Sequence, residues 1–279
     1  MSSNLRTQFI NHLTLHRLSP KTIEAYIGAV HGLTKYYMIP PDKISDKQIQ
    51  DYLRYLIKDR KLAWSTCNVT FSGLIKFYKN VLNREKMNFT IPPRTRSKKI
   101  PMILGIEEVH HLLDSISNLK HRALLTAVYS GGLRVSEVVR LKPHHIESDP
   151  SRMMIRIENG KGGKDRYTIL SPKFLKLLKE YWIEYRPKEW LFFGKNINKP
   201  MPTGTAQRIY YNAKKKAGIT KGRGIHTLRH CFASHLLWSG QDIHVIKRLL
   251  GHGSIKTTFK YFHVTKEQLS KVVSPLDNL

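Results

Sequence analysis

The sequence has little cysteine, few acidic residues and no long apolar run. Its two cysteines, Cys67 and Cys231, lie far apart and form no CxxC pair, so neither a disulfide framework nor a zinc site is expected. We expect both to lie in helices as small buried hydrophobic residues. Since no segment resembles a membrane span or the apolar core of a signal peptide, we predict a cytoplasmic protein without membrane contact.

The scarcity of acidic residues leaves a large positive charge. The 279 residues include 48 Lys and Arg but only 20 Asp and Glu, a formal net charge of +28. A compact chain of this charge repels itself unless a polyanion neutralises it, which favours a nucleic-acid partner. Two other interpretations are a basic structural protein without an active site and an anionic membrane surface as partner, although no basic amphipathic helix or lipid anchor is found.

One change of composition divides the chain. Residues 88–103 (NFTIPPRTRSKKIPMI) contain three prolines around the basic residues Arg94, Arg96, Lys98 and Lys99. Proline interrupts regular structure, and the basic side chains stay in solvent or on DNA phosphates, so we interpret this segment as an interdomain linker. We therefore expect one domain at residues 1–87 and a second at residues 104–279.

The first domain is predicted to be helical, because its apolar residues recur at helical spacing. Its excess of Lys and Arg over Asp and Glu makes DNA binding its expected role. In the second domain, residues 106–117 and 120–141 are predicted to be helical, and so are residues 226–279, punctuated by Gly240, Gly251 and Gly253. Helix starts or caps are expected at Ser19, Ser45, Ser65, Ser171 and Thr203.

A change of period interrupts the helices of the second domain. Ile155 and Ile157 alternate with polar residues, and Tyr167 and Ile169 do so again, which predicts two strands. The Gly-rich segment 158–165 between them is typical of a β-hairpin turn. The predicted fold is therefore mainly α-helical with a small β-sheet.

The hairpin turn carries Lys161 and Lys164 and has a superficial likeness to a phosphate-binding loop. A P-loop needs Gly, four residues, and then Gly-Lys-Ser/Thr at the start of a helix. Here Glu158 stands at the position of the first glycine and Asp165 follows Lys164, so ATP binding is not expected.

The run His226-Thr227-Leu228-Arg229-His230 places an imidazole and a guanidinium three residues apart, on one helical face, where they suit a phosphate. With His235 it could also suggest a metal site. We do not expect one, because no carboxylate is close in sequence and Cys231, adjacent to His230, points elsewhere.

The run Ser130-Gly131-Gly132-Leu133-Arg134 predicts the end of one helix and the start of the next. Arg134 would then lie at a helix N-terminus, where backbone amides also favour an anion. Glu137, three residues further, is expected to hold the guanidinium in place.

Taken together, these segments are similar to the tyrosine recombinase family, which includes phage integrases and Xer recombinases. The resemblance covers nearly the whole chain and implies a helical core-binding domain followed by an α-rich catalytic domain. The departures are mild: Gly131-Gly132 stands where one glycine is common, and Phe262 where threonine is common. The residues that match the family's catalytic positions are Arg134, Lys161, His226, Arg229, His252 and Tyr261, with Glu137 as the supporting acidic residue.

The resemblance implies DNA cleavage by Tyr261 with a 3′-phosphotyrosine intermediate, without metal, ATP or any other cofactor. Arg134 and Arg229 would stabilise the phosphate charge with help from His252, His226 would accept the tyrosine proton, and Lys161 would protonate the leaving oxygen. It also implies duplex DNA as partner and a tetramer, or a paired recombinase, in which the tail after Tyr261 docks on a neighbour. Such an enzyme, Xer-like or from a mobile element, would act on nucleoid DNA in integration, excision or resolution. The alternatives are a type IB topoisomerase-like enzyme and a DNA-binding regulator without catalysis.

Overall fold

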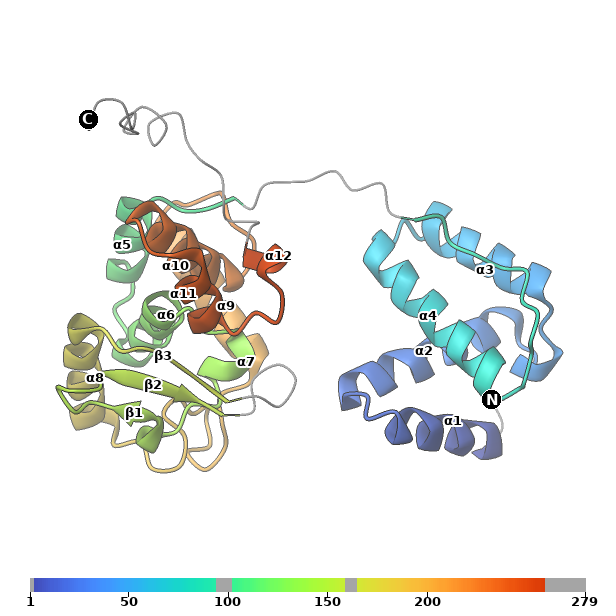
Figure 1. The fold of residues 1–279 in the computed structure, drawn as a ribbon, viewed down its shortest axis with the longest axis horizontal. Helices are drawn as coiled ribbons and strands as arrows, with labels where there is room; N and C mark the ends of the chain where they lie inside the picture. Colours follow the sequence, from blue (N-terminus) through green and yellow to red (C-terminus); the bar gives the residue numbers. More distant parts are fainter. Residues whose placement is uncertain (1–2, 94–101, 159–164, 259–279) are drawn as a thin grey trace, which may run out of the picture. The chain divides into compact units, whose positions relative to one another are not determined.

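The computed structural model describes residues 3–93, 102–158 and 165–258. The chain divides into two compact units, residues 1–98 and 99–279, and Figure 1 shows the fold of each. Helices dominate both units, and the one sheet of the described residues belongs to the second. No helix in the described part of the chain has the length and apolar character needed to cross a bilayer.

The first unit consists of four helices around one apolar core. Helix α2 packs along α4, and a Cβ at Gly73 would lie 3.1 Å from the Cα of Tyr26, so glycine is what permits this close approach. The four helices are α1 (Ser3–Leu15), α2 (Pro20–Tyr37), α3 (Asp46–Lys58) and α4 (Trp64–Asn80), with a 3₁₀ turn, η1, at Pro41–Lys43.

The structure corrects two of the predicted helix starts. The side chains of Ser19, Ser45 and Ser171 cap their helices as predicted, each accepting a backbone N–H of the first turn. Helix α4 begins at Trp64, one residue before Ser65, and Thr203 is the first residue of its helix rather than the cap. In both helices the preceding residue is the N-cap, and its side chain makes no hydrogen bond to the first turn.

The beginning of the expected linker is fixed to the first unit. Phe89 and Ile91 are buried in its core, and the N–H of Thr90 donates to Gln50 Oε1 at 2.8 Å. The start of the expected linker therefore alternates between exposed residues and two side chains, Phe89 and Ile91, that are buried against the first unit. The basic residues Arg94, Arg96, Lys98 and Lys99 lie outside the described residues.

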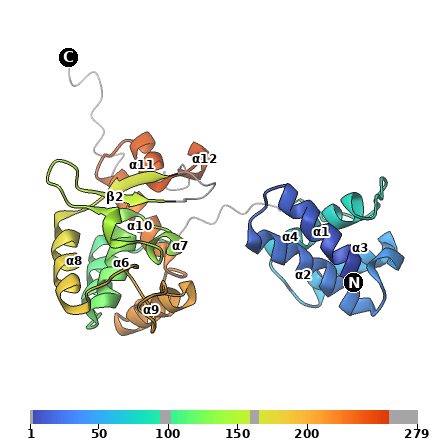
Figure 2. The same ribbon diagram turned by 90° about the horizontal axis from the view of Figure 1, so that it is seen from below.

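The second unit packs helices around a small antiparallel sheet of order β1-β2-β3. The predicted hairpin is confirmed as β2 paired with β3, with Ile155 opposite Thr168, while the two-residue strand β1 was not foreseen. Figure 2 shows α10 between α11 and α6, both of which it contacts. The elements are α5 (Ile106–Asp114), α6 (Leu119–Gly131), α7 (Val135–Val138), η2 (Pro143–His145), β1 (Ile146–Glu147), β2 (Met154–Ile157), β3 (Arg166–Ile169), α8 (Pro172–Tyr185), α9 (Thr203–Lys216), α10 (His226–Trp238), α11 (Ile243–Leu250) and α12 (Ile255–Thr258).

Both cysteines are buried in helices, as predicted. The sulfur of Cys231 accepts the backbone N–H of Leu104 at 3.3 Å, and burial raises the pKa of this thiol to about 11. His235 on the same helix α10 bonds the Leu104 carbonyl through Nε2 at 3.0 Å. The start of the second unit is thereby attached to the helix that carries His226 and Arg229.

Candidate active site

Arg134 occupies the junction between two helices. Helix α6 ends at Gly131, and Gly132 follows in the left-handed conformation (φ 60°). Arg134 is then the N-cap of the short helix α7, whose Glu137 accepts both the backbone N–H of Arg134 at 2.7 Å and its Nη1 at 2.6 Å. The predicted contact between Arg134 and Glu137 is therefore present. It holds the partly exposed guanidinium of Arg134 in place at the turn between α6 and α7.

Glu137 lies at the centre of a cluster of guanidinium groups. Its carboxylate receives a two-pronged contact from Arg166, with nitrogen–oxygen distances of 2.8 and 2.9 Å, and lies 3.7 Å from Arg229. Burial by itself would raise the pKa of Glu137, but the hydrogen bonds and charges of Arg166 and Arg134 lower it to about 2. One negative charge thus faces three positive ones, which leaves the cluster with a net positive charge suited to an anion.

Arg229 belongs to helix α10 and is buried, with 4% of its surface exposed. Its Nη1 donates to the Gly132 carbonyl at 2.5 Å and its Nη2 to the Leu250 carbonyl at 2.6 Å. These are the C-terminal ends of α6 and α11, where helix carbonyls have no partner within the helix and carry partial negative charge. The guanidinium is therefore held rigidly by backbone groups far apart in sequence.

His252 follows helix α11 and contacts the same guanidinium. Its Nε2 lies 3.3 Å from Arg229 Nη2, and its Nδ1 lies 3.0 Å from the Thr258 hydroxyl. Arginine only donates, so Nε2 is the acceptor and the ring proton lies on Nδ1. Burial, followed by the charges of Arg229, Arg134 and Arg166, lowers the pKa of His252 to about 4, so the ring is neutral at neutral pH.

His226 is the first residue of α10, and part of its surface is open to solvent while neighbouring protein atoms cover the rest. This partial loss of hydration, and then the charges of Arg229 and Arg134, lower the pKa of the ring, while Glu137 opposes the change. His226 therefore stands beside the cluster as a neutral imidazole at neutral pH, the form that accepts a proton.

Lys161, Lys164 and Tyr261 lie outside the described residues. In sequence, Lys161 and Lys164 fall between β2 and β3, and Tyr261 follows the last residue of α12 by three positions.

Sequence reasoning missed Arg166, which lies at the start of β3 with 9% of its side chain exposed. A single arginine in an alternating strand has no local signal of a buried role. The only hint is its place directly after the lysine-rich turn, in the run Lys164-Asp165-Arg166.

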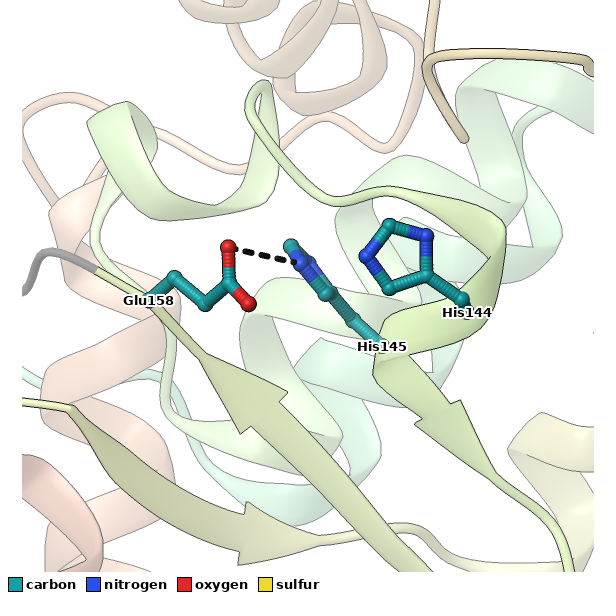
Figure 3. Close-up of side chains that lie close together, drawn as sticks. All are labelled: His144, His145 and Glu158. Atoms are coloured by element: carbon teal, nitrogen blue, oxygen red, sulfur yellow. Dashed lines mark ion pairs between the residues drawn. The ribbon is translucent and has the colours of Figure 1, made fainter.

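A separate group, His144, His145 and Glu158, has possible ligand atoms within 4.8 Å of one another, and Figure 3 shows the Glu158 carboxylate facing the His145 ring. Nδ1 of the buried His145 accepts the Lys142 N–H at 3.1 Å, so the ring proton lies on Nε2. Nε2 is 3.3 Å from Glu158, close but out of line for a hydrogen bond. A metal ion would need the lone pair that this proton occupies, so the chemistry fits a polar contact at the base of the hairpin rather than a metal site.

His235, for which the sequence predicted no metal, has a structural role. Its Nε2 donates to the Leu104 carbonyl, and its Nδ1 lies 2.9 Å from the Tyr129 hydroxyl. Both nitrogens are thus engaged by the protein itself, and burial lowers the pKa of the ring.

Comparison with known proteins gives two family matches that together cover most of the chain. Residues 103–268 match the phage integrase family, and residues 5–87 match the N-terminal SAM-like domain of phage integrases. The chain is 36% identical over 276 residues to the putative integrase/recombinase y4qK of Sinorhizobium fredii, covering 99% of this chain and 89% of that protein. It is 30% identical to the tyrosine recombinase XerC of Lactobacillus leichmannii, covering 95% and 96%.

Solved structures give the same result for the fold. XerA recombinase aligns over 96% of each chain with 29% identity and a TM-score of 0.55. XerH recombinase bound to its difH substrate aligns over 91% of this chain and 80% of that one, with 22% identity and a TM-score of 0.73.

The fold and the family matches define a DNA strand transferase of the tyrosine recombinase class. The chain belongs to the phage integrase family, and within it to the tyrosine recombinases, the enzymes of site-specific DNA recombination. This membership favours recombination over both a relaxing topoisomerase and a regulator without catalysis.

The turn at Gly132 gives a test of how tightly the cluster is packed. Gly132→Ala is expected to lower the free energy of unfolding by about 3 kcal/mol, because a side chain there combines a left-handed backbone with overpacking. The added Cβ would lie 2.4 Å from the Phe232 ring. Urea unfolding measures the change.

Gly218 provides the matched control. It has a similar φ of 64°, but a Cβ there would meet nothing within 4 Å. Gly218→Ala is therefore expected to cost only the backbone strain, about 1–2 kcal/mol. Equal destabilisation by the two variants would contradict the close packing of Gly132 against α10.

Proposed function

We propose that this recombinase cleaves duplex DNA by attack of Tyr261 on a phosphodiester. The phenol oxygen forms a bond to phosphorus while the bond to the 5′-oxygen breaks, which leaves a 3′-phosphotyrosine and a 5′-hydroxyl. Because the phosphate ester is conserved, the reverse attack by a 5′-hydroxyl rejoins the strand without ATP. The observation that supports the proposal is the cluster in which Arg134 and Arg229 lie beside Glu137 and His252 contacts Arg229.

The transition state of this step spreads negative charge over the non-bridging oxygens of the phosphate. Arg134 and Arg229 are the groups that would stabilise it, because fixed guanidinium donors act strongly in a partly buried site. Glu137 cancels only part of their charge and orients Arg134. His252 contacts Arg229 Nη2 and thereby helps to hold the guanidinium in position.

Two proton transfers complete the step. A tyrosine with its ordinary pKa of about 10 is a weak nucleophile at neutral pH. His226 is the proposed acceptor of its proton, since its lowered pKa keeps the ring neutral. Lys161 is the proposed donor to the leaving 5′-oxygen. Neither transfer calls for a metal ion or an organic cofactor.

The partners are proposed from the relatives. XerH was solved with its DNA substrate, and a lambda integrase tetramer was solved on a Holliday junction. We propose that residues 1–87 and 104–279 of this chain bind duplex DNA as core-binding and catalytic domains, with basic contacts from Arg94, Arg96, Lys98, Lys99 and Lys164. The active assembly would be a tetramer, or a paired recombinase, on nucleoid DNA in the cytoplasm.

Covalent trapping tests the proposed chemistry. A duplex is first selected from a random pool by binding to the protein, and nicked versions of it are incubated with the enzyme in EDTA. We expect a band on a denaturing gel that contains both protein and DNA, because the arginines replace the metal ion in stabilising charge. A band that forms only after Mg²⁺ is added would refute the metal-free mechanism, and the absence of any covalent band on every selected duplex would refute the phosphotyrosine step.

A further inference from the structure

Arg166 is the first residue of β3, and its buried guanidinium contacts two separate elements. Both of its terminal nitrogens bind the two carboxylate oxygens of Glu137, at 2.8 and 2.9 Å. Its Nε donates to the carbonyl of Leu249 at 2.9 Å. One side chain thus connects the β-hairpin with α7 and with the end of α11.

The end of α11 is a place where three arginines converge. Three consecutive carbonyl oxygens each accept from a different arginine: Leu249 from Arg166 at 2.9 Å, Leu250 from Arg229 at 2.6 Å, and Gly251 from Arg134 at 3.3 Å. The negative end of a helix favours such cations. Arg166 therefore belongs to the same hydrogen-bonded framework as the two arginines of the proposed phosphate site.

The packing around Arg166 is tight. A Cβ at position 251 would lie 2.7 Å from the Cδ of Arg166, and Gly251 has a φ of 61°. This glycine is both the C-cap of α11 and the residue before His252. The position of the Arg166 side chain is consequently coupled to the backbone that presents His252.

The charge balance of Glu137 shows what Arg166 contributes. With Arg166 present, the carboxylate has both oxygens occupied by the fork, and Arg134 approaches one of them through Nη1. Without Arg166, the buried Glu137 carboxylate would face Arg134 and Arg229 alone. The carboxylate would then draw these two guanidinium groups towards itself and away from a bound phosphate.

We infer that Arg166 is a positioning residue for DNA cleavage. It occupies the Glu137 carboxylate and holds the end of α11, so that Arg134 and Arg229 keep the geometry that a phosphate needs. Arg166 itself does not touch the DNA. The inference rests on the proposed function and adds to it a residue outside the family's catalytic set.

The first test compares Arg166→Met and Arg166→Lys with the native enzyme on the selected duplex. Cleavage by Arg166→Met is expected to slow by about 10²-fold, the effect of displacing a catalytic group by about 1 Å. Arg166→Lys keeps the charge but loses the fork, so a loss of roughly tenfold is expected. Affinity for the uncleaved duplex should stay within about threefold, because Arg166 does not contact phosphate.

Arg156 is the matched control. It lies on the paired strand β2 and contacts Glu158 and Asp165 at 3.4 and 3.6 Å, but 43% of its side chain is exposed. Since exposed ion pairs contribute little, Arg156→Met should leave cleavage unchanged. Equal losses from Arg156→Met and Arg166→Met would overturn the inference, because the effect would then be a general one on the hairpin.

A second measurement separates stabilisation of the phosphate from protonation of the leaving group. A 5′-bridging phosphorothiolate at the mapped cleavage position releases a thiolate, which leaves without a proton because its pKa is far below that of an alcohol. Since Arg166 acts through Glu137, Arg134 and Arg229, its variants should slow the oxygen and the sulfur substrate by the same factor. A loss confined to the oxygen substrate would overturn the inference and assign Arg166 to the leaving-group side.

A double-mutant cycle identifies the partner through which Arg166 acts. If Arg166 works through Glu137, the variant with both Arg166→Met and Glu137→Gln should be no slower than the slower single variant. Losses that multiply would overturn the proposed route. Thermal unfolding shows whether each variant is folded, and Arg166→Lys serves in both measurements if Arg166→Met is not.

The two hypotheses fail in different ways. If the native enzyme forms no covalent complex with any selected duplex, the proposed function is wrong. If the native enzyme cleaves and Arg166→Met cleaves at the same rate, only the role of Arg166 is wrong.

Discussion

Tyr261→Phe is expected to abolish the covalent protein–DNA complex while the protein still binds its duplex. The substitution removes only the phenolic oxygen, the atom proposed to attack phosphorus, and phenylalanine has no group that could replace it. The measurement is the denaturing gel of the trapping assay, together with a native gel for binding. A covalent band of undiminished intensity would show that another residue is the nucleophile.

A second tyrosine serves as control for this result. Tyr211 lies on α9 with 51% of its surface exposed, and the proposed mechanism gives it no role. Tyr211→Phe should give a covalent band as strong as that of the native enzyme. Loss of the band in both variants would point to a general sensitivity of the catalytic domain to substitution.

Arg229→Lys is expected to reduce the rate of strand cleavage by about 10³-fold, which is typical for removal of one fixed donor to a transition-state oxyanion. Lysine keeps the charge, but it cannot form two directed bonds to the Gly132 and Leu250 carbonyls and also present a planar fork to phosphate. Single-turnover cleavage of the nicked duplex at saturating enzyme measures the effect without the contribution of binding.

Arg122→Lys is the control for this variant. Arg122 lies near the N-terminus of α6, at the other end of the helix from the site, and it makes only a 4.0 Å contact with Glu180, with 38% and 49% of the two side chains exposed. The Arg122→Lys variant should cleave DNA at the native rate. If Arg229→Lys retained cleavage within tenfold of the native enzyme, the buried guanidinium would have a structural role only.

The sequence predicted those features of the site that depend on neighbours in the chain. Gly131-Gly132 predicted the end of one helix and the position of Arg134 at the start of another. The spacing of three residues predicted the contact of Arg134 with Glu137. The resemblance to tyrosine recombinases supplied the set of catalytic positions, although Lys161 and Tyr261 lie outside the described residues.

Contacts between distant segments were not predictable in this way. Arg166 is 29 residues from Glu137, and the pairing of Arg229 with His252 crosses from α10 to the end of α11. Nor did the composition of residues 88–103 reveal that Phe89 and Ile91 are buried in the first unit. In each case the partner is selected by packing of whole helices and strands.

By itself, the sequence of this protein determined the helices, the hairpin and the positive charge, because period, caps and turn residues act within a few positions of the chain. Only the tertiary structure decided that the ends of α6 and α11 meet around Arg229, and that Arg166 closes the cluster on Glu137. The reason is physical: burial removes water from these polar groups, so each carbonyl and carboxylate requires a partner, and the fold provides it from a remote segment.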